Sequence, residues 1–538
     1  MNMNTDVMLS YKKKMYKDII SVDAMIGYNL YTERSDGSAA DGSNFVLAGN
    51  PSFGNCQVLQ YSASDGSRYR KMGAYGQAVV GFKDILYYTY TARNDWSSML
   101  SLNNNSYFYD SNSLSYIFSR TLNIPVITFG KIRASYASVG SDRGAGNTKE
   151  IYSAVLGNGP GGIRFPFNGI SAFSPSDNAA NPNIKPEISK EFEVGLEMSF
   201  LKSRLGFEFA YYDKNSRNQI MSASLTSSTG YSSATMNIGE ITNKGFEVTL
   251  NATPIKTKDF TWNLGLNWST NKSLVVKMAP EMEVINIAYG VEIRTGQPVP
   301  IIALDYYIKD DKGLEIIVDD PTLQTYGYPL RADNYKGKER ISGKVEPDWF
   351  GGLRSEFTYK AFSLSAFLDV RAGGYQNSMT EQYLLSGGLS VFTANRPLDD
   401  KIILPGVKGH VVTNNGIKTL VTTEIPNDVP VSFNRYIASG GYGAALFNEK
   451  YRVQKSNYMR LRDVTIAYKL PKTLLDKTKF IKSLTVSLTG NNIWRKFDKG
   501  YTGSDPEYTN GGSSNAQGLN YWLLSSYSSY TLGLNLTF

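Results

Sequence analysis

Apolar and polar side chains alternate without exception over the last nine residues of the chain. Tyr530, Leu532, Leu534, Leu536 and Phe538 share one parity, and Thr, Gly and Asn occupy the positions between them. Because a β-strand directs successive side chains to opposite faces, this segment predicts a strand with one apolar and one polar face. Such a strand is typical of a membrane barrel, with lipid on one side and a wet lumen on the other.

The same period of two recurs along most of the chain and predicts about fifteen strands. Their expected spans are 6–14, 20–34, 67–83, 85–98, 107–121, 130–140, 189–202, 204–221, 237–255, 260–277, 348–360, 362–376, 457–470, 483–497 and 528–538. Many of them exceed the roughly nine to eleven residues that a strand needs to cross hydrocarbon. No helix is expected among them, apart from one short turn within residues 472–482.

The predicted connections alternate between short and long. Lys202–Ser203 is expected to form a tight hairpin, whereas the long loops fall near 35–66, 141–188, 222–236, 278–347, 377–456 and 498–527. Outer-membrane barrels have this asymmetry, with short periplasmic turns and long outer loops. The loop at 377–456 is too long to lack structure, so it is expected to contain short strands of its own.

Composition is compatible with this fold. Hydrophobic residues make up 41% of the chain, and the chain has no apolar run long enough for a spanning helix. A membrane barrel is not excluded, because the signal of each strand is weak. The 13% of aromatic residues fits either cross-strand pairs in a β core or girdles at two membrane interfaces.

A soluble sandwich also alternates apolar and polar residues, and a surface β-rich adhesin is an alternative of that kind. A soluble propeller would repeat every 40–50 residues or so, and no such repeat is detected. The number of long strands, the alternating connection lengths and the aromatic terminus together favour an all-β fold: a transmembrane antiparallel β-barrel.

Several chemistries are excluded. One cysteine (Cys56) and one histidine (His410) allow neither an internal disulfide nor the usual zinc site, and His410 is expected in a solvated loop. No nucleophile elbow or phosphate-binding loop appears, so the chain is expected to be no enzyme, with no catalytic residue, metal or cofactor. The net charge is +8, but the basic residues are scattered, so nucleic acid is not an expected partner.

Several segments carry a family resemblance. They are Ala92–Ser98, Gly130–Tyr136, Asn181–Glu187, Glu193–Glu197, Asn237–Glu247, Tyr458–Asp463, Thr489–Asn492 and Gly533–Phe538. Together they resemble the barrel of SusC/RagA-type TonB-dependent transporters. The matches occur in order from about residue 6 to the end of the chain.

The resemblance implies a 22-stranded barrel around a plug domain, of which residues 1–538 would supply about the last fifteen strands. The signal peptide, the plug and the first strands would then belong to a portion that this chain lacks. The strand count supports this expectation, because first and last strands of equal direction cannot close an antiparallel barrel.

The implied function is outer-membrane import of oligosaccharide or peptide fragments. The implied partners are a SusD-like surface lipoprotein, the missing plug portion, and the TonB complex acting through that portion. A siderophore or cobalamin receptor without a lipoprotein is the alternative within transport. The outer-membrane insertion machinery is a further expected partner, with Tyr530, Leu532, Leu534, Leu536 and Phe538 as its assembly signal.

Charged residues at lumen parity are candidates for lining the transport path. They are Lys131, Arg133, Glu191, Glu193, Glu197, Glu208, Asp369 and Arg371. The alternative is that they are solvated lumen groups or plug-facing pairs; a glycosidase pair is rejected because a wet wall needs carboxylates at alternate positions. In the last long loop, Tyr521 and Trp522 are candidates for stacking on substrate or for anchoring the loop. The acidic segment Lys309–Gly313 lacks calcium-loop spacing, so no metal is expected.

Overall fold

The computed structural model describes the chain except residues 64–65, 143–147, 156, 159–163, 280–281, 333–340, 416, 438–448, 479 and 513–516. Fifteen long strands form one sheet in the order β1-β2-β5-β6-β7-β8-β14-β15-β18-β19-β25-β26-β33-β34-β36. Each strand in this order therefore neighbours the next long strand along the chain. The fifteen strands and the antiparallel fold class predicted from the alternation are confirmed, and parts of the predicted loops lie outside the described residues.

The observed strands agree with the predicted spans, mostly to within three residues. They are β1 (Asn2–Met15), β2 (Ile20–Ser35), β5 (Ser67–Phe82), β6 (Leu86–Ser97), β7 (Ser106–Tyr116), β8 (Ile127–Ser141), β14 (Glu187–Phe200), β15 (Leu205–Arg217), β18 (Gly239–Lys256), β19 (Phe260–Met278), β25 (Trp349–Tyr359), β26 (Phe362–Ala372), β33 (Tyr458–Lys469), β34 (Ser483–Phe497) and β36 (Ser529–Thr537).

Three strands end four or five residues earlier than predicted, and the backbone explains each difference. After β7, residues Phe118–Arg120 form a 3₁₀ turn. After β15, Asn218 has a positive φ of 57°, and after β26 both Gly373 and Gly374 have a φ near +80°. A left-handed residue interrupts the extended backbone, so the strand cannot continue through it.

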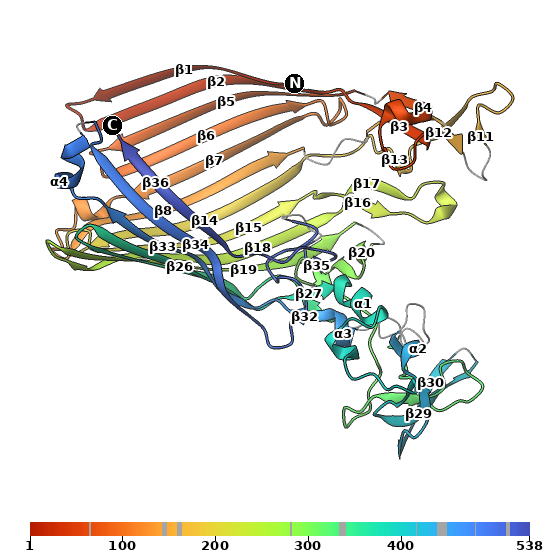
Figure 1. Cartoon of the computed structure of the whole chain (residues 1–538). Helices are drawn as coiled ribbons and strands as arrows, with labels where there is room; N and C mark the ends of the chain where they lie inside the picture. The colour runs from red at the N-terminus through yellow and green to blue at the C-terminus, as the bar shows by residue number, and fades with distance from the viewer. Residues whose placement is uncertain are drawn as a thin grey trace. The chain divides into compact units, whose positions relative to one another are not determined.

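The chain divides into two compact units. In the first, β1, β2, β5, β6 and β7 lie side by side (Figure 1). In the register of β1 and β2, Lys12 lies opposite Asp23, and their side chains form an ion pair of 2.7 Å. The buried core of this unit is small and contains Leu100, Tyr107 and Ile184.

Tight turns join neighbouring strands at the ends opposite the long loops. The connection between β14 and β15 spans four residues rather than the predicted two, because Leu201, Lys202 and Ser203 are all left-handed, with φ of 54°, 58° and 62°. Tyr16–Asp18 repeats this conformation between β1 and β2. The hairpin itself is confirmed, but its length is not, since three successive left-handed residues need a longer turn than Lys202–Ser203 allows.

In the second unit, six strands place apolar side chains in a single cross-strand row. The row runs Trp262, Phe357, Leu364, Ile466, Leu488 and Leu532. The next positions along the same strands form a polar row: Asn263, Glu356, Ser365, Thr465, Thr489 and Thr531. Directly opposite residues on paired strands share a face, so the two rows define an apolar and a polar face.

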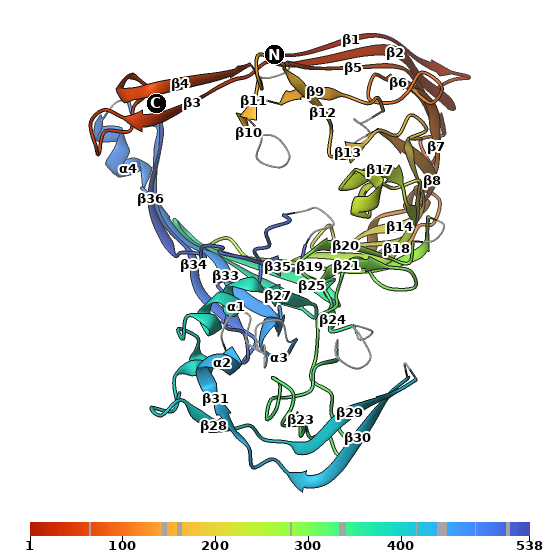
Figure 2. The ribbon, with the colours of Figure 1, turned by 90° about the vertical axis from the view of Figure 1, so that its right-hand side faces the viewer.

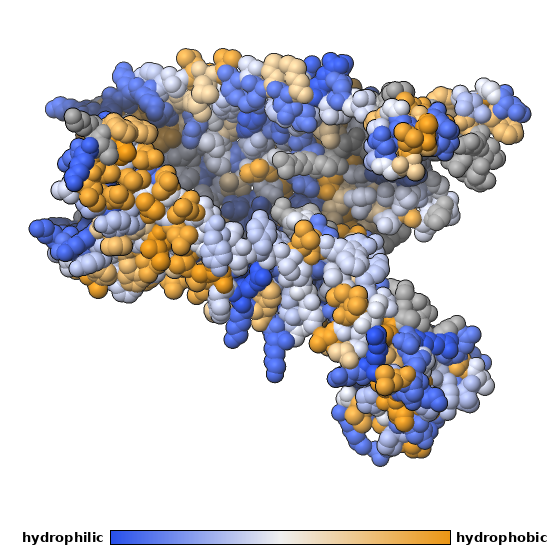
Figure 3. All heavy atoms as spheres, viewed as in Figure 1, coloured by the Kyte–Doolittle hydropathy of each residue, from blue (hydrophilic) through white to orange (hydrophobic). Residues whose placement is uncertain are grey.

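The apolar face is exposed rather than covered by protein. Ile466 is 54% exposed and Leu532 is 69% exposed. Figure 3 shows hydrophobic side chains gathered over β33, β34 and β36. Contiguous apolar surface of this kind is costly in water and fits contact with lipid.

The well-packed cores of the second unit lie between β19 and β25 and between β26 and β33, in two of the predicted long loops. One core includes Tyr307, Ile317, Tyr328, Val431 and Phe433. It is built on short strands, as expected: β23 (Ile316–Val318) pairs with β29 (Val407–Asn414), which forms a hairpin with β30 (Ile417–Pro426; Figure 2). Burial is thus concentrated in loop residues, because the wall strands have no protein on their apolar face.

Two expectations about this region are wrong. Helices α1 (Met379–Ser386), α2 (Phe433–Ile437) and α3 (Glu449–Arg452) occur in the loop at 377–456, in addition to the expected α4 (Lys472–Leu475). His410 lies in strand β29 rather than in an open loop, because Val407–Asn414 is held between β23 and β30. None of the described helices is long and apolar enough to cross a membrane.

Candidate functional site

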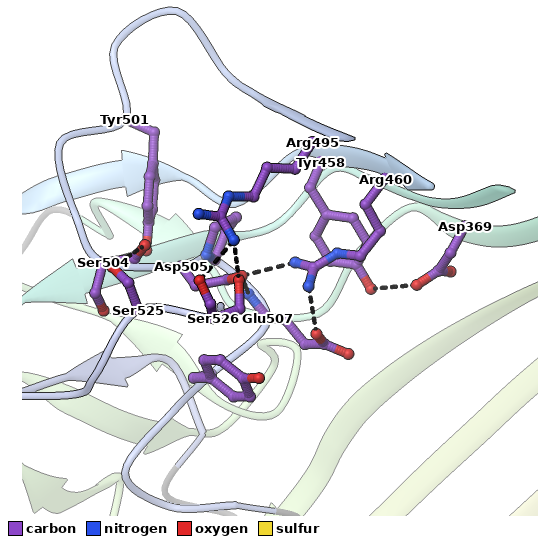
Figure 4. A network of polar contacts seen from close by, with 12 residues as sticks. Asp369, Tyr458, Arg460, Arg495, Tyr501, Ser504, Asp505, Glu507, Ser525 and Ser526 are labelled. Atoms are coloured by element: carbon purple, nitrogen blue, oxygen red, sulfur yellow. Dashed lines mark hydrogen bonds and ion pairs between the residues drawn. The ribbon is translucent and has the colours of Figure 1, made fainter. Parts of the chain in front are cut away.

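A buried ion pair joins the last long loop to the wall strands. Arg460 of β33 has a side chain 1% exposed, and its Nη2 donates to Asp505 Oδ1 at 2.7 Å, with Asp505 fully buried (Figure 4). The Arg460 guanidinium also lies 4.4 Å from the centre of the Tyr458 ring. A buried charge pair needs hydrogen bonds to offset its desolvation, and charge-assisted bonds are the strong kind.

Further bonds extend this pair into a network. Asp505 accepts hydrogen bonds from the Glu507 amide at 3.0 Å and from the Ser526 hydroxyl. Arg495 of β34 donates to the Ser526 carbonyl at 2.6 Å. Asp505 lies near the start of the loop and is attached to β33, and Ser526 lies near its end and is attached to β34. The loop is therefore fixed near both of its ends.

The predicted lumen residue Asp369 belongs to the same network. Arg462 Nε donates to Asp369 Oδ2 at 2.8 Å, and the Arg462 guanidinium also binds Glu507. Tyr458 donates to Asp369 at 3.3 Å. Asp369 thus helps to hold the loop through Arg462, and its place on a transport path stays a prediction.

A second anchor comes from β27 (Tyr375–Ser378). The buried Gln376 donates to the carbonyls of Pro506 and Tyr508 at 2.9 and 3.0 Å and accepts from the Tyr501 hydroxyl at 2.9 Å. Burial raises the pKa of Tyr501, so its hydroxyl remains a donor over the physiological range. Strand β35 (Leu519–Asn520) pairs with β27 as well.

These anchors present four aromatic side chains, here called the aromatic platform: Tyr289, Tyr383, Tyr521 and Trp522. Tyr521 is central, with ring centroids 6.1 Å from Tyr289 and 5.8 Å from Tyr383. Tyr383, from α1, lies 5.4 Å from Trp522. Tyr289 and Trp522 are each 58% exposed, so the platform offers ring surface to solvent.

Backbone bonds hold the platform in place. Asn510 donates to the Tyr521 carbonyl at 2.9 Å and accepts from its amide at 2.6 Å. Thr380 Oγ1 accepts from the Trp522 amide at 2.9 Å. Asn377, whose carbonyl oxygen accepts from the buried Arg452 at 3.0 Å, donates to the Tyr289 carbonyl at 2.6 Å. Burial lowers the pKa of Arg452 to about 10.

The other predicted lumen residues are distributed over both units. In the first unit, Arg133 and Glu193 form an ion pair of 2.7 Å. Lys131 lies on the same face of β8 as Arg133, and Glu191 lies on the same face of β14 as Glu193. In the second unit, Glu197 and Glu208 line a cavity of about 590 Å³ together with Glu356. Arg371 lines a different cavity and donates to the Val345 carbonyl at 2.9 Å.

The terminal strand is placed as its alternation predicts. Tyr530, Leu532, Leu534 and Leu536 are exposed on the apolar face, and Phe538 stacks on Phe480 with centroids 6.3 Å apart. Their role as an assembly signal stays a prediction. Within the described parts of the chain, no group of three or more His, Cys, Asp or Glu side chains is placed to hold a metal ion.

The sequence singled out Tyr521, Trp522 and Asp369 as candidates, whose roles stay predictions, but it did not indicate which residues they contact. Tyr289 and Tyr383 come from segments more than a hundred residues away, and no local pattern connects them to Tyr521. Arg460 lies within Tyr458–Asp463, one of the segments that carry the family resemblance. An arginine on a strand of an otherwise apolar wall needs a counter-charge, so the sequence could have predicted an acidic partner for Arg460.

The long antiparallel strands, the lipid-type face and the folded outer loops define a β-barrel of the outer membrane. The family model "TonB dependent receptor-like, beta-barrel" matches residues 13–493, and the chain belongs to this family. The members are TonB-dependent transporters of the outer membrane, a class of transporters and not of enzymes, and this chain is of the SusC/RagA type.

Relatives and solved structures agree with this assignment. TonB-dependent receptor P3 of Formosa agariphila is 26% identical over 98% of the chain and 52% of its own length. TonB-dependent receptor SusC of Bacteroides thetaiotaomicron is 27% identical over 36% of the chain and 19% of its own length. The structure of the RagAB peptide transporter has a TM-score of 0.76 at 18% identity, covering 100% of this chain and 55% of that chain. Nearly the whole chain is matched in TonB-dependent receptor P3 and in RagAB, but it spans only about half the length of each of them.

Proposed function

We propose that this chain forms most of the barrel wall of an active outer-membrane importer for oligosaccharide or peptide fragments. The aromatic platform is the observation that carries the proposal. Exposed rings stack on the apolar faces of sugar rings and on peptide side chains, and neither contact needs a charged group. Tyr289, Tyr383 and Trp522 are exposed, yet their backbones are fixed by Asn377, α1 and Thr380. A preordered surface of this kind loses little entropy on binding.

The proposed system has two further components. A SusD-like surface lipoprotein would cooperate with the long loops, and the TonB complex would supply energy through a plug portion outside residues 1–538. The resemblance to SusC and the fold shared with RagA support this arrangement. RagAB is a peptide transporter, so peptides remain a candidate substrate class beside oligosaccharides.

Ligand binding tests the platform. The complete transporter that contains this chain is purified in detergent and titrated calorimetrically with panels of oligosaccharides and short peptides. Trp522→Ala and Tyr383→Ala are each expected to weaken binding of the recognised ligand about tenfold, the value of one lost stacking contact. Tyr527→Ala is the matched control, because Tyr527 is 79% exposed in the same loop but outside the platform.

If all three variants bind the ligand as tightly as the wild type does, the aromatic platform does not take part in substrate capture. Binding of ferric siderophores or cobalamin, with no response to glycans or peptides, would favour the alternative receptor type. Co-purification of a surface lipoprotein at stoichiometric amounts supports the two-component arrangement, and its absence under mild extraction contradicts it.

A further inference from the structure

A basic cavity lies where β26, β33 and β34 meet their long loops. It has a volume of about 680 Å³ and is lined by four lysines: Lys344, Lys455, Lys496 and Lys499. Met459 and Phe497 contribute apolar wall to the same cavity. All of its lining residues lie in the second unit.

One side of this cavity belongs to the lipid-type face of the sheet. On β26, Val370 has the same parity as Leu364 of the apolar row. Val370 lies opposite Met459, and Met459 lies opposite Lys496, so these three side chains share that face. Met459 is 38% exposed. Lys496 therefore stands at the end of an apolar surface that faces the membrane.

The depth of the cavity matches the level of lipid headgroups. From Phe362, at the short-turn end of β26, to Val370 the strand advances about 27 Å. With the tilt of about 40° usual for such strands, this corresponds to a height of about 20 Å, close to the roughly 25 Å apolar band of an outer-membrane barrel. Lys496 lies two strands from Val370 in the cross-strand row, and along β34 it is about 43 Å from the short-turn end at Ser483, a height of about 33 Å, which places it just beyond the outer edge of that band.

The charges of the cavity are not balanced within the described residues. Lys344 pairs with Asp348 at 2.7 Å, and Asp498 accepts a hydrogen bond from Asn457 at 2.9 Å. Lys455, Lys496 and Lys499 are exposed, and among the described residues none of these three has an ion pair. Like charges gathered at one place repel one another, and a multivalent anion relieves that repulsion.

We propose that this cavity binds the phosphate of a phosphorylated lipid headgroup in the outer leaflet of the membrane. Lys455, Lys496 and Lys499 would donate charge-assisted hydrogen bonds to the phosphate oxygens. The acyl chains would lie along Val370, Met459 and the apolar row below them. A free phosphate would use the lysines alone and leave this apolar surface uncovered, so the continuity of the two surfaces favours a lipid.

Native mass spectrometry of the detergent-purified complete transporter tests the proposal. The probes are a glycolipid bearing phosphate monoesters, the same lipid after phosphatase treatment, and inorganic phosphate. The variant K455Q/K496Q/K499Q is expected to bind the phosphorylated lipid on the order of 100-fold more weakly, because each lysine near an anionic lipid surface contributes to attraction. The wild-type protein is expected to bind the phosphatase-treated lipid weakly.

The matched control is K472Q/K477Q/K482Q, which removes the same charge from exposed lysines at the opposite, short-turn end of β33 and β34. It is expected to bind as the wild type does, and unchanged heat-dependent gel migration shows that both variants are folded. Equal binding by both triple variants, or by treated and untreated lipid, would overturn the proposal. Displacement of the lipid by micromolar inorganic phosphate would overturn the lipid assignment as well. Substrate capture at the aromatic platform is independent of each of these outcomes.

Discussion

Arg460 and Asp505 meet 2.7 Å apart with both side chains withdrawn from solvent, although 44 residues separate them along the chain. The pair connects a wall strand with the loop that carries Tyr521 and Trp522. Because neither charge has water around it, each depends on the other for its stability.

Removal of one member of this pair is therefore expected to be costly. Asp505→Asn removes the buried counter-charge of Arg460 and leaves it only the Glu507 carboxylate at 2.8 Å, so it is expected to lower stability by about 3 kcal/mol. The temperature at which the folded band disappears in heat-modifiable gels measures the effect. The double variant Arg460→Met/Asp505→Leu, which removes both charges, is expected to recover most of the loss. A single variant as stable as the wild type would contradict this account.

The two cross-strand rows predict opposite tolerance at adjacent positions. Leu488 lies about 17 Å along β34 from its short-turn end, near the middle of the apolar band, and is 51% exposed. Leu488→Arg is expected to cost about 2–4 kcal/mol because it places a charge in hydrocarbon.

The neighbouring change Thr489→Arg serves as the control. Thr489 lies on the polar face and shares a hydrogen bond of 2.9 Å with Thr465, so its replacement is expected to cost only about 1 kcal/mol. Denaturant unfolding in lipid vesicles measures both variants. Equal losses at the two positions would mean that the assignment of the faces is wrong.

The strand-to-loop transition at Gly374 predicts a third sensitive position. Its φ is +82°, and a Cβ there would meet the Val345 carbonyl oxygen at 2.6 Å. Gly374→Ala is expected to destabilise the loop attachment by about 1–3 kcal/mol through strain and steric conflict with backbone. Gly296→Ala is the control, because Gly296 is also left-handed but its added Cβ meets nothing within 4 Å. Limited proteolysis of the loops compares the two, and equal cleavage would contradict the steric part of the argument.

Asn510 tests how the platform is positioned. Asn510→Asp keeps the shape but removes the donor to the Tyr521 carbonyl and places a negative charge beside it. Ligand affinity is expected to fall about tenfold, with the melting behaviour of the wall unchanged. Asn510→Gln, which retains a donor and an acceptor, is expected to recover part of the affinity. An unchanged affinity in Asn510→Asp would show that Tyr521 needs no such support.

Asp400 predicts a pH-dependent change in the outer region. The Ser432 hydroxyl at 2.6 Å and the Asn434 amide at 2.7 Å lower the pKa of Asp400 below its ordinary value. A carboxylate with a lowered folded-state pKa stabilises above its unfolded value of about 3.9, and this contribution is lost as the pH falls through the folded value. The protection of the Asn434 amide, which is its exchange rate compared with the intrinsic rate at the same pH, is expected to fall over that acidic range, and Asp400→Asn is expected to abolish this pH dependence. Protection that stays constant over the acidic range would contradict the role of Asp400.

Most of the wall was predictable from sequence, because a period of two is a local property. Segments such as Leu484–Leu488 reveal both the strand and its faces without any partner. Turn length was less accessible: the predicted pair Lys202–Ser203 became four residues because left-handed conformations at non-glycine residues leave no clear sequence signal.

The outer region was harder to predict for two different reasons. Helix α1 carried a readable signal, since Ser378 caps the amide of Glu381 at 3.1 Å in the serine-to-glutamate spacing of a capping box. The aromatic platform carried none beyond Tyr521 and Trp522, because Tyr289 and Tyr383 reach it only through tertiary packing. In the sequence, Lys496 and Lys499 look like ordinary lysines at the start of a loop. Only the pairing of the strands shows that they lie beside an apolar surface.

The position of the buried cores has a consequence for divergence. The wall strands require only that apolar and polar residues alternate, so many side chains are interchangeable at Leu364 or Thr465. The loop core around Ile317 and Tyr436 is interdigitated and closed, so exchanges of shape there are penalised. We therefore expect random mutagenesis to find the membrane wall permissive and the outer architecture restrictive, the reverse of the pattern in proteins whose surface loops carry no core.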